Sequence, residues 1–489
     1  MRFYHLGQDD YWLDEFHSLA SSAGKRAEFE LFTYGRIVEE SIVWTDLDNR
    51  STLGAAWRSM RHDSHPPLYF MTLLLWRRAL GDTEAAVRSL SAGMSVLSIV
   101  PVILLLSAVG RHRAGLLAGL ILAVSFAHIR MAQEARPYSM SIFITSSTYL
   151  LLVLAEPQWS TGTRRARFVI SAAYGASLYL AVLTHYFAGL ALLGHVAYAA
   201  VRLRGPAFRL WAVTALAAAL AAAGTWLVPF VAQVAFIRTQ PWLAPRGPDH
   251  LWQTLLRLTD LPIRLLLQTT PFKTFWWQSA AGFLLLGGSL LLLARKWDRA
   301  ALACTVWFVV PALLLFALDL ATHKELLKHL RYPAVAVPGM AGLVALALDR
   351  LRTPLRWTAL IGLLVAVALR LELPASAHPH ARAAAEQLRA VATPEDLVIY
   401  DAVGWPIDWI PQFHAPIVHY LGETRYPTLL LREPMADDLK AQVQTYPRII
   451  VISPRIDAVP NPSPGTHRPV ARSEYIFQVG WFYVFVKQS

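Results

Sequence analysis

The stretch Ala300–Leu320 reads AALACTVWFVVPALLLFALDL and decides the fold class. Its charged side chain, Asp319, lies at the end of a run that is otherwise almost entirely apolar. An apolar run of about 20 residues is the length that an α-helix needs to cross a bilayer. The stretch therefore predicts a membrane-spanning helix. The single cysteine, Cys304, lies within it, which excludes an intramolecular disulfide.

Composition extends this interpretation to the whole chain. Of the 489 residues, 55% are hydrophobic and 16% are charged, which is too apolar for an ordinary soluble protein. The net charge of +12 could indicate a nucleic-acid partner, but the arginines fall in short clusters between apolar runs. We therefore expect a polytopic α-helical membrane protein whose partners include the lipid bilayer and no nucleic acid. About ten segments have the composition of spans, namely residues 88–108, 114–129, 138–155, 168–184, 186–201, 208–231, 276–294, 300–320, 333–349 and 357–373.

The connections between these spans predict the orientation. Every second connection carries a basic cluster, and the positive-inside bias assigns those connections to the cytoplasm. The N-terminal region, the turns 130–137 and 184–186, the loops 232–275 and 321–332, and everything after about Leu373 are then outside. The cytoplasmic clusters are Arg111/Arg113, Arg164/Arg165/Arg167, Arg202/Arg204/Arg209, Arg295/Lys296/Arg299 and Arg350/Arg352/Arg356.

The N-terminal region, residues 1–87, is mixed and polar. Two prolines, Pro66 and Pro67, open a helix over 66–80 that is too short to cross the bilayer and carries Trp76-Arg77-Arg78. We expect that helix to lie in the membrane interface. No apolar segment precedes this outer region, so its export predicts an additional apolar segment upstream of Met1.

The segment 374–489 follows the predicted transmembrane domain, 88–373, and differs from it in composition. It bears prolines and charges, and we expect a small extracytoplasmic α/β domain. The strands carry no glycine-rich phosphate loop, which leaves a nucleotide site without support. The expected elements are a helix at 381–391 and strands at 397–400, 417–420, 448–452 and 475–486.

The stretch Gln8–Ser18 places four acids and His17 ahead of the membrane domain. Carboxylates at a water–lipid boundary are candidates for acid–base chemistry, and Asp14 and Glu15 stand out as a pair. The alternative is structural, because acids favour the first turn of a helix.

Cations occur in two short loops on the side where the bias disfavours them. Arg130 and Arg136 flank Glu134, and Lys324, Lys328, His329 and Arg331 share the later loop. A phosphate at the outer surface would explain them through charge-assisted hydrogen bonds. The alternative is that long basic side chains reach either interface. Outer histidines could also bind a divalent metal, but no pair has the spacing typical of a metal site, and we expect no cofactor.

Five motifs, taken together and in order, resemble those of the GT-C glycosyltransferases that use polyprenyl-phosphate sugars. The resemblance covers about residues 1–350 and is strongest to the bacterial branch with protein O-mannosyltransferases and lipid A aminoarabinose transferases. It implies a bacterial cytoplasmic membrane enzyme that transfers a hexose or pentose to a glycan, lipid or protein acceptor. The motifs are WLDEFHS at 12–18, HPPLYFMTLLLWRRALGDTEAAVRSLSA at 65–92, QEARPYSM at 133–140, LTHYFA at 183–188 and HLRYPAVAVP at 329–338.

The resemblance also implies roles for residues within these motifs. Asp14 matches the family's catalytic base, with Glu15 beside it, and Glu134 lies near the second acidic position. Arg331 matches the basic residue near the lipid phosphate, and Lys324 and Arg136 are expected to support it. Ser64-His65 replaces the acid and lysine that aminoarabinose transferases carry before the double proline, so their metal contact is not implied here. The expected substrate-binding residues are His65, Tyr69, Gln133, Tyr138 and His185.

The expected chemistry is a single displacement that inverts the anomeric centre. It requires a base for the acceptor hydroxyl and positive charge for the departing phosphate. Helix 66–80 and the aromatic stretch Phe272–Trp277 would hold the lipid chain. Two alternatives belong to other classes: a transporter of a lipid-linked or small glycan, and a non-catalytic envelope assembly protein. Transporters usually show repeat symmetry and ionisable groups near the midplane, whereas here the charges gather at one face.

Overall fold

The computed structural model describes residues 2–29, 33–38, 43–239, 250–267, 276–294, 297–370, 380–403, 409–453, 467–472 and 481–487. The chain divides into two compact units. The first unit comprises Met1–Leu6, Met60–Gly81 and Ala85–Leu373, and the second comprises Gly7–Ser59, Asp82–Glu84 and Pro374–Ser489.

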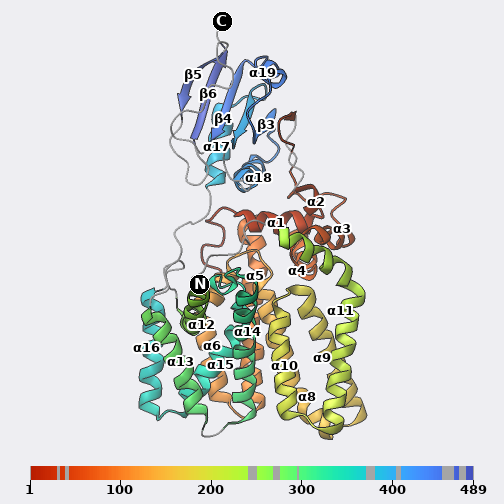
Figure 1. The fold of residues 1–489 in the computed structure, drawn as a ribbon, viewed down its shortest axis with the longest axis vertical. Coiled ribbons are helices and arrows are strands. Elements are labelled where there is room, and N and C mark those ends of the chain that lie inside the picture. The colour runs from red at the N-terminus through yellow and green to blue at the C-terminus, as the bar shows by residue number, and fades with distance from the viewer. Residues whose placement is uncertain are drawn as a thin grey trace. The chain divides into compact units, whose positions relative to one another are not determined.

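The first unit is a bundle of helices (Figure 1). Among the described residues, seven of its helices are long and apolar enough to cross a membrane, or eight if the bent pair α6 (His112–Val124) and α7 (Phe126–Ala132) is one span. Two shorter apolar helices, α10 and α16, coincide with further predicted spans. The helices are α4 (Leu68–Leu80), α5 (Glu84–Ala108), α6 (His112–Val124), α7 (Phe126–Ala132), α8 (Tyr138–Thr161), α9 (Arg164–Thr184), α10 (Ala188–Arg202), α11 (Gly205–Thr239), α12 (His250–Leu266), α13 (Trp276–Ala294), α14 (Arg299–Thr322), α15 (Val337–Arg350) and α16 (Thr353–Arg370).

Helix α12 corrects the sequence-based expectation of a loop over 232–275. It is strongly amphipathic and carries three buried charged residues, Arg257, Asp260 and Arg264. A search for uninterrupted apolar runs does not find such a helix, because its charged face interrupts the run. Of the predicted aromatic stretch, Phe272–Phe275 lies outside the described residues, and Trp276 and Trp277 are exposed at the start of α13.

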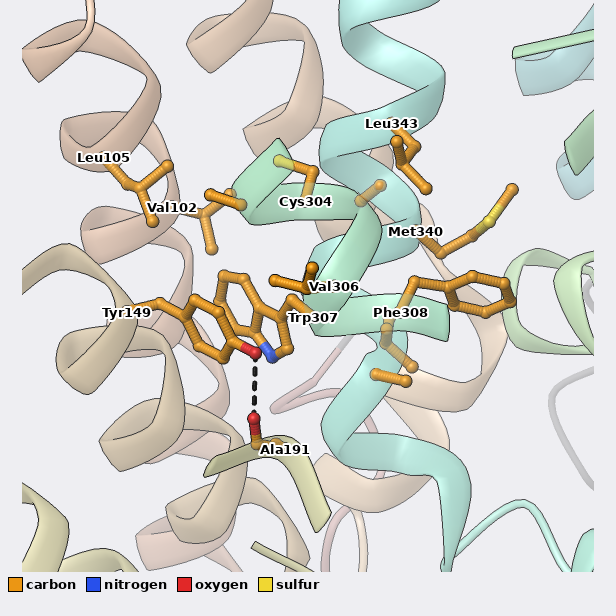
Figure 2. Packing of buried hydrophobic residues seen from close by; sticks show 14 of the residues in the cluster. Val102, Leu105, Tyr149, Ala191, Cys304, Val306, Trp307, Phe308, Met340 and Leu343 are labelled. Atoms are coloured by element: carbon orange, nitrogen blue, oxygen red, sulfur yellow. Dashed lines mark hydrogen bonds between the residues drawn. The ribbon is translucent and has the colours of Figure 1, made fainter. Parts of the chain in front are cut away.

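The bundle core depends on close helix packing around α14 (Figure 2). The Tyr149 ring stacks on Trp307 with centroids 4.2 Å apart, and its hydroxyl donates to the Ala191 carbonyl at 2.8 Å. A Cβ added to Gly339 would lie 2.8 Å from the backbone nitrogen of Phe308, so only glycine allows α14 and α15 to approach this closely. Small residues allow the same close approach in many membrane bundles.

The second unit contains a six-stranded sheet in the order β1-β3-β2-β4-β6-β5. Strands β2, β3 and β4 are parallel, and β1 and β6 flank them antiparallel. Helices α17, α18 and α19 lie between the strands in sequence (Figure 1). The elements are β1 (Ile37–Val38), α17 (Ala381–Val391), β2 (Leu397–Asp401), α18 (Trp409–Leu421), β3 (Thr428–Leu431), α19 (Asp437–Val443), β4 (Arg448–Ser453), β5 (His467–Arg472) and β6 (Trp481–Lys487).

The prediction of a strand at residues 417–420 of this domain is wrong. Residues 417–420 form the end of helix α18, and the strand follows later as β3. A short apolar run fits a buried strand or a buried helix equally well, and only the surrounding contacts decide between them. Helix 381–391 and the strands near 397 and 448 appear where the sequence predicts them. Of the expected strand 475–486, residues 475–480 lie outside the described part, and β6 covers residues 481–486.

The N-terminal segment folds with the C-terminal region rather than separately. Strand β1 extends the sheet by pairing Ile37 with Leu429 and Val38 with Thr428. Helix α1 (Leu13–Ala23), which carries the paired acids, belongs to the same unit. The acidic segment and the α/β domain are therefore joined by both backbone pairing and side-chain packing.

Candidate functional site: an acidic helix and a cluster of cations

The paired acids lie in the first turn of α1, as the structural alternative predicts. The Glu15 carboxylate accepts the Trp12 backbone N–H at 3.3 Å, and Glu15 is fully buried. This contact satisfies one of the donors that a helix start leaves without an intrahelical partner. Asp14 is only half-buried. The geometry therefore gives the capping role to Glu15 and leaves Asp14 the more accessible carboxylate of the pair.

A second group gathers in the helical unit around His65. Its Nδ1 lies 2.9 Å from an Asp63 carboxylate oxygen, and its Nε2 lies 3.2 Å from an Arg136 guanidinium nitrogen. The His185 ring lies 5.3 Å from the His65 ring and also 5.3 Å from the Tyr138 ring. Residues from three separate loops or helix ends therefore meet here.

Electrostatics extend this group to Arg331. Burial lowers the pKa of His185 well below its usual value, and the charges of His65, Arg136 and Arg331 lower it further. His185 is therefore a neutral imidazole near pH 7. Ring contacts also connect Arg331 to this region. The ring of Phe187, two residues after His185, lies 4.8 Å from the Tyr332 ring, and the Arg331 guanidinium lies 5.2 Å from the Tyr332 ring centre.

Charged side chains of α14 and α12 bind the backbone of the loop that carries Arg331. The Asp319 carboxylate accepts the backbone N–H groups of Leu326 and Leu327, the latter at 2.8 Å. Arg264 donates to the Leu327 carbonyl and, at 3.3 Å, to the Lys328 carbonyl. Two backbone carbonyls and two N–H groups of the loop are thereby fixed. The candidate Lys324 is half-buried in the same loop and is not part of these contacts.

The other predicted site residues make separate contacts within the helical unit. Glu134 is buried and forms an ion pair with Arg130 at 3.0 Å. The Gln133 side chain donates to the Tyr4 carbonyl at 3.3 Å. Tyr69 is fully buried and reaches the group through Ser91, whose hydroxyl lies 3.1 Å from the Tyr69 hydroxyl and donates to the Arg136 carbonyl at 3.1 Å.

Sequence reasoning missed Gln233, whose side chain binds the backbone at His65. The Gln233 side chain donates to the His65 carbonyl at 3.0 Å and to the Met60 carbonyl, and it accepts from the Tyr186 hydroxyl. The Trp226 indole donates to the Tyr186 hydroxyl at 2.8 Å. The signal in the sequence is a glutamine within a largely apolar run; the structure buries it fully, and buried amides need partners.

This arrangement suits an oxyanion. Arg136 and Arg331 carry permanent positive charges, and both lie close enough to His185 to lower its pKa. Guanidinium groups bind phosphate oxygens through directed, charge-assisted hydrogen bonds. Among the described residues, no group of three or more His, Cys, Asp or Glu side chains has the arrangement of a metal site.

The fold of this chain is similar to the folds of several solved structures. No family model and no curated protein sequence matches the chain. The crystal structure of ArnT from Cupriavidus metallidurans in the apo state is similar, with a TM-score of 0.60 and 14% identity over 99% of this chain and 95% of that one. ArnT bound to undecaprenyl phosphate gives a TM-score of 0.57 at 13% identity, with the same coverage. The Archaeoglobus fulgidus oligosaccharyltransferase with Zn and sulfate gives 0.50 at 13% identity, over 91% of this chain and 64% of that one.

These likenesses define the class of fold. The chain has the fold of the ArnT structures, and it combines a bundle of apolar helices with a small C-terminal α/β domain, as the sequence predicts. Within that class, its similarity extends over nearly the full length of both chains in the comparison with ArnT.

Proposed function

We propose that this protein is a membrane glycosyltransferase that moves a sugar from a polyprenyl-phosphate donor to an acceptor hydroxyl. The observation that carries the proposal is the contact of His65 with Arg136 and His185, with Arg331 reaching the same group through Tyr332 and Phe187, in a chain with the fold of ArnT. The similar ArnT was crystallised with undecaprenyl phosphate, which supports a polyprenyl phosphate as the lipid carrier.

The proposed reaction is a single displacement. The acceptor oxygen forms a bond to the anomeric carbon, the bond from that carbon to the phosphate oxygen breaks, and polyprenyl phosphate leaves. Asp14 accepts the proton of the acceptor hydroxyl. Arg331, supported by Arg136 and Lys324, stabilises the negative charge that grows on the phosphate. One such displacement inverts the anomeric centre, in contrast to a double displacement through a covalent intermediate.

Transfer can be tested with the purified full chain added to membranes of a strain that lacks the gene. We expect those membranes to accumulate a polyprenyl-phosphate sugar, and the added protein to consume it and form a glycosylated product. The matched control is the Asp14→Asn protein, which should leave the donor unconsumed. Sugar counterflow in vesicles without any new glycoside would support a transporter. The absence of both transfer and counterflow would support an assembly protein.

We further propose that the acidic helix and the C-terminal domain face the outside of a bacterial cytoplasmic membrane. Pairing of β1 with β3 requires both segments to lie on one side of the membrane. The alternation of basic loops assigns that side to the exterior. A reporter that is active only in the cytoplasm should stay silent when fused after Ser489 and be active when fused after Arg204. Strong activity of the Ser489 fusion would reverse the proposed orientation.

A further inference from the structure

The backbone just before the acidic helix is bound by one tyrosine of the C-terminal domain. The Tyr420 hydroxyl accepts the Tyr11 backbone N–H at 2.8 Å and donates to a Glu84 carboxylate oxygen at 2.8 Å. Tyr420 lies near the end of α18, and Tyr11 lies two residues before α1 begins. The Tyr11 hydroxyl in turn donates to the Asp82 carbonyl at 3.1 Å. The entry to α1 is thus held from two directions within the second unit.

A second contact, between Asp10 and Arg382, also joins the segment before α1 to the C-terminal domain. Asp10 accepts the backbone N–H of Arg382 at 2.8 Å, and its carboxylate lies 3.3 Å from the Arg382 guanidinium. Arg382 is in the first turn of α17, where free N–H groups and the helix dipole favour an acid. Arg382 also pairs with Glu84, and its guanidinium lies 5.1 Å from the Tyr420 ring centre. Asp10, Glu84, Arg382 and Tyr420 therefore form one network, the α1 anchor.

Aromatic packing continues the link into α1 itself. Phe16 is fully buried, with its ring 5.4 Å from His419 and 6.5 Å from Tyr420. The Tyr11 ring lies 5.7 Å from His419, and the Thr45 hydroxyl lies 2.8 Å from the His419 Nδ1. Residues on both sides of Asp14 in sequence are thereby fixed against α18.

We infer that the C-terminal domain positions the catalytic helix, with Tyr420, Arg382 and Asp10 as positioning residues for Asp14. The inference rests on the proposed function, because it assigns a purpose to holding Asp14. The first turn of a helix frays unless it is tied down, and Asp14 lies in that turn. A base displaced by about 1 Å can lose on the order of 100-fold in rate, so a fixed helix start matters for transfer. The network is partly buried and its members hydrogen-bond to one another, which restricts the geometry of the helix start.

Tyr420→Phe removes both hydrogen bonds of the hydroxyl and keeps the ring. In the full chain, we expect kcat to fall by roughly 10-fold, with little change in KM for the lipid donor. Hydrogen exchange at the backbone of Tyr11–Ala23 should accelerate, which reports the anchor without any reaction. The matched control is Tyr426→Phe, a buried tyrosine of the same domain core, which should change neither measurement.

Further variants keep the test decisive. Asp10→Asn should accelerate the same exchange and lower kcat, and Arg382→Lys should restore part of what Arg382→Ala loses, because lysine retains the charge. Unchanged exchange and unchanged kcat in both Tyr420→Phe and Asp10→Asn would overturn the inference, even if Asp14→Asn abolishes transfer. If Asp14→Asn transfers normally, the assignment of Asp14 as the base fails instead, and if the wild-type protein transfers no sugar, the proposed function fails. In both cases the exchange measurement still reports whether the anchor holds α1.

Discussion

Asp14→Asn is expected to lower transfer by on the order of 100-fold or more, with folding and donor binding nearly unchanged. Asparagine keeps the shape of the side chain and removes its basicity. Asp14 is half-buried, and the capping contact at the start of α1 comes from Glu15 instead. The measurement is the turnover of purified protein with a polyprenyl-phosphate sugar, together with donor binding and thermal unfolding.

Glu15→Gln is the matched control for this prediction. The glutamine carbonyl can still accept the Trp12 N–H, so we expect a much smaller loss of turnover than in Asp14→Asn. A wild-type rate in Asp14→Asn would contradict the proposed mechanism. The base would then move to Glu134, a buried carboxylate that is 3.0 Å from Arg130 and near the cation cluster in sequence.

Arg331→Ala is expected to give the second large loss, also on the order of 100-fold in turnover, with a smaller effect on acceptor binding. The reason is that phosphate charge grows in the transition state, where a guanidinium contributes most. Arg331→Lys should recover only part of the rate, because lysine keeps the charge and lacks the planar fork. The measurements are kcat and acceptor KM for both variants.

The control for Arg331 is Arg352→Ala, an exposed arginine in a loop assigned to the cytoplasm. It should leave turnover unchanged. The free energy of unfolding of Arg331→Ala should fall only slightly, because the Arg331 contact with the Tyr332 ring contributes only about 0.5–1 kcal/mol. A normal rate in Arg331→Ala would show that Arg331 serves folding or topology and does not stabilise the phosphate.

Several elements were predictable from the sequence because their cause is local. The run at 300–320 is long and apolar, and it lies within α14. The amphipathic pattern at 381–391 coincides with α17, whose apolar face is buried and whose other face is polar. Helix α12 and the end of α18 were not predictable in the same way, since a charged face or a short apolar run fits more than one structure.

The candidate site also has a part that the sequence predicts and a part that only the tertiary structure shows. The sequence alone marks Asp14, Glu15 and Arg331 through the order of motifs, and it predicts the membrane class from composition. The resemblance favours Asp14 over Glu15 as the base, although both acids also fit a helix start. The tertiary structure adds a physical difference between them, because Glu15 turns back to the Trp12 N–H.

Only the tertiary structure brings together residues that are far apart in the chain. His65, Arg136 and His185 come from three different connections, and their contacts depend on how the helices pack. The link between Tyr11 and Tyr420 spans most of the sequence and has no local signal. Hydrophobic periodicity records which face of an element is buried, whereas the partner of that face is decided by the packing of the whole chain.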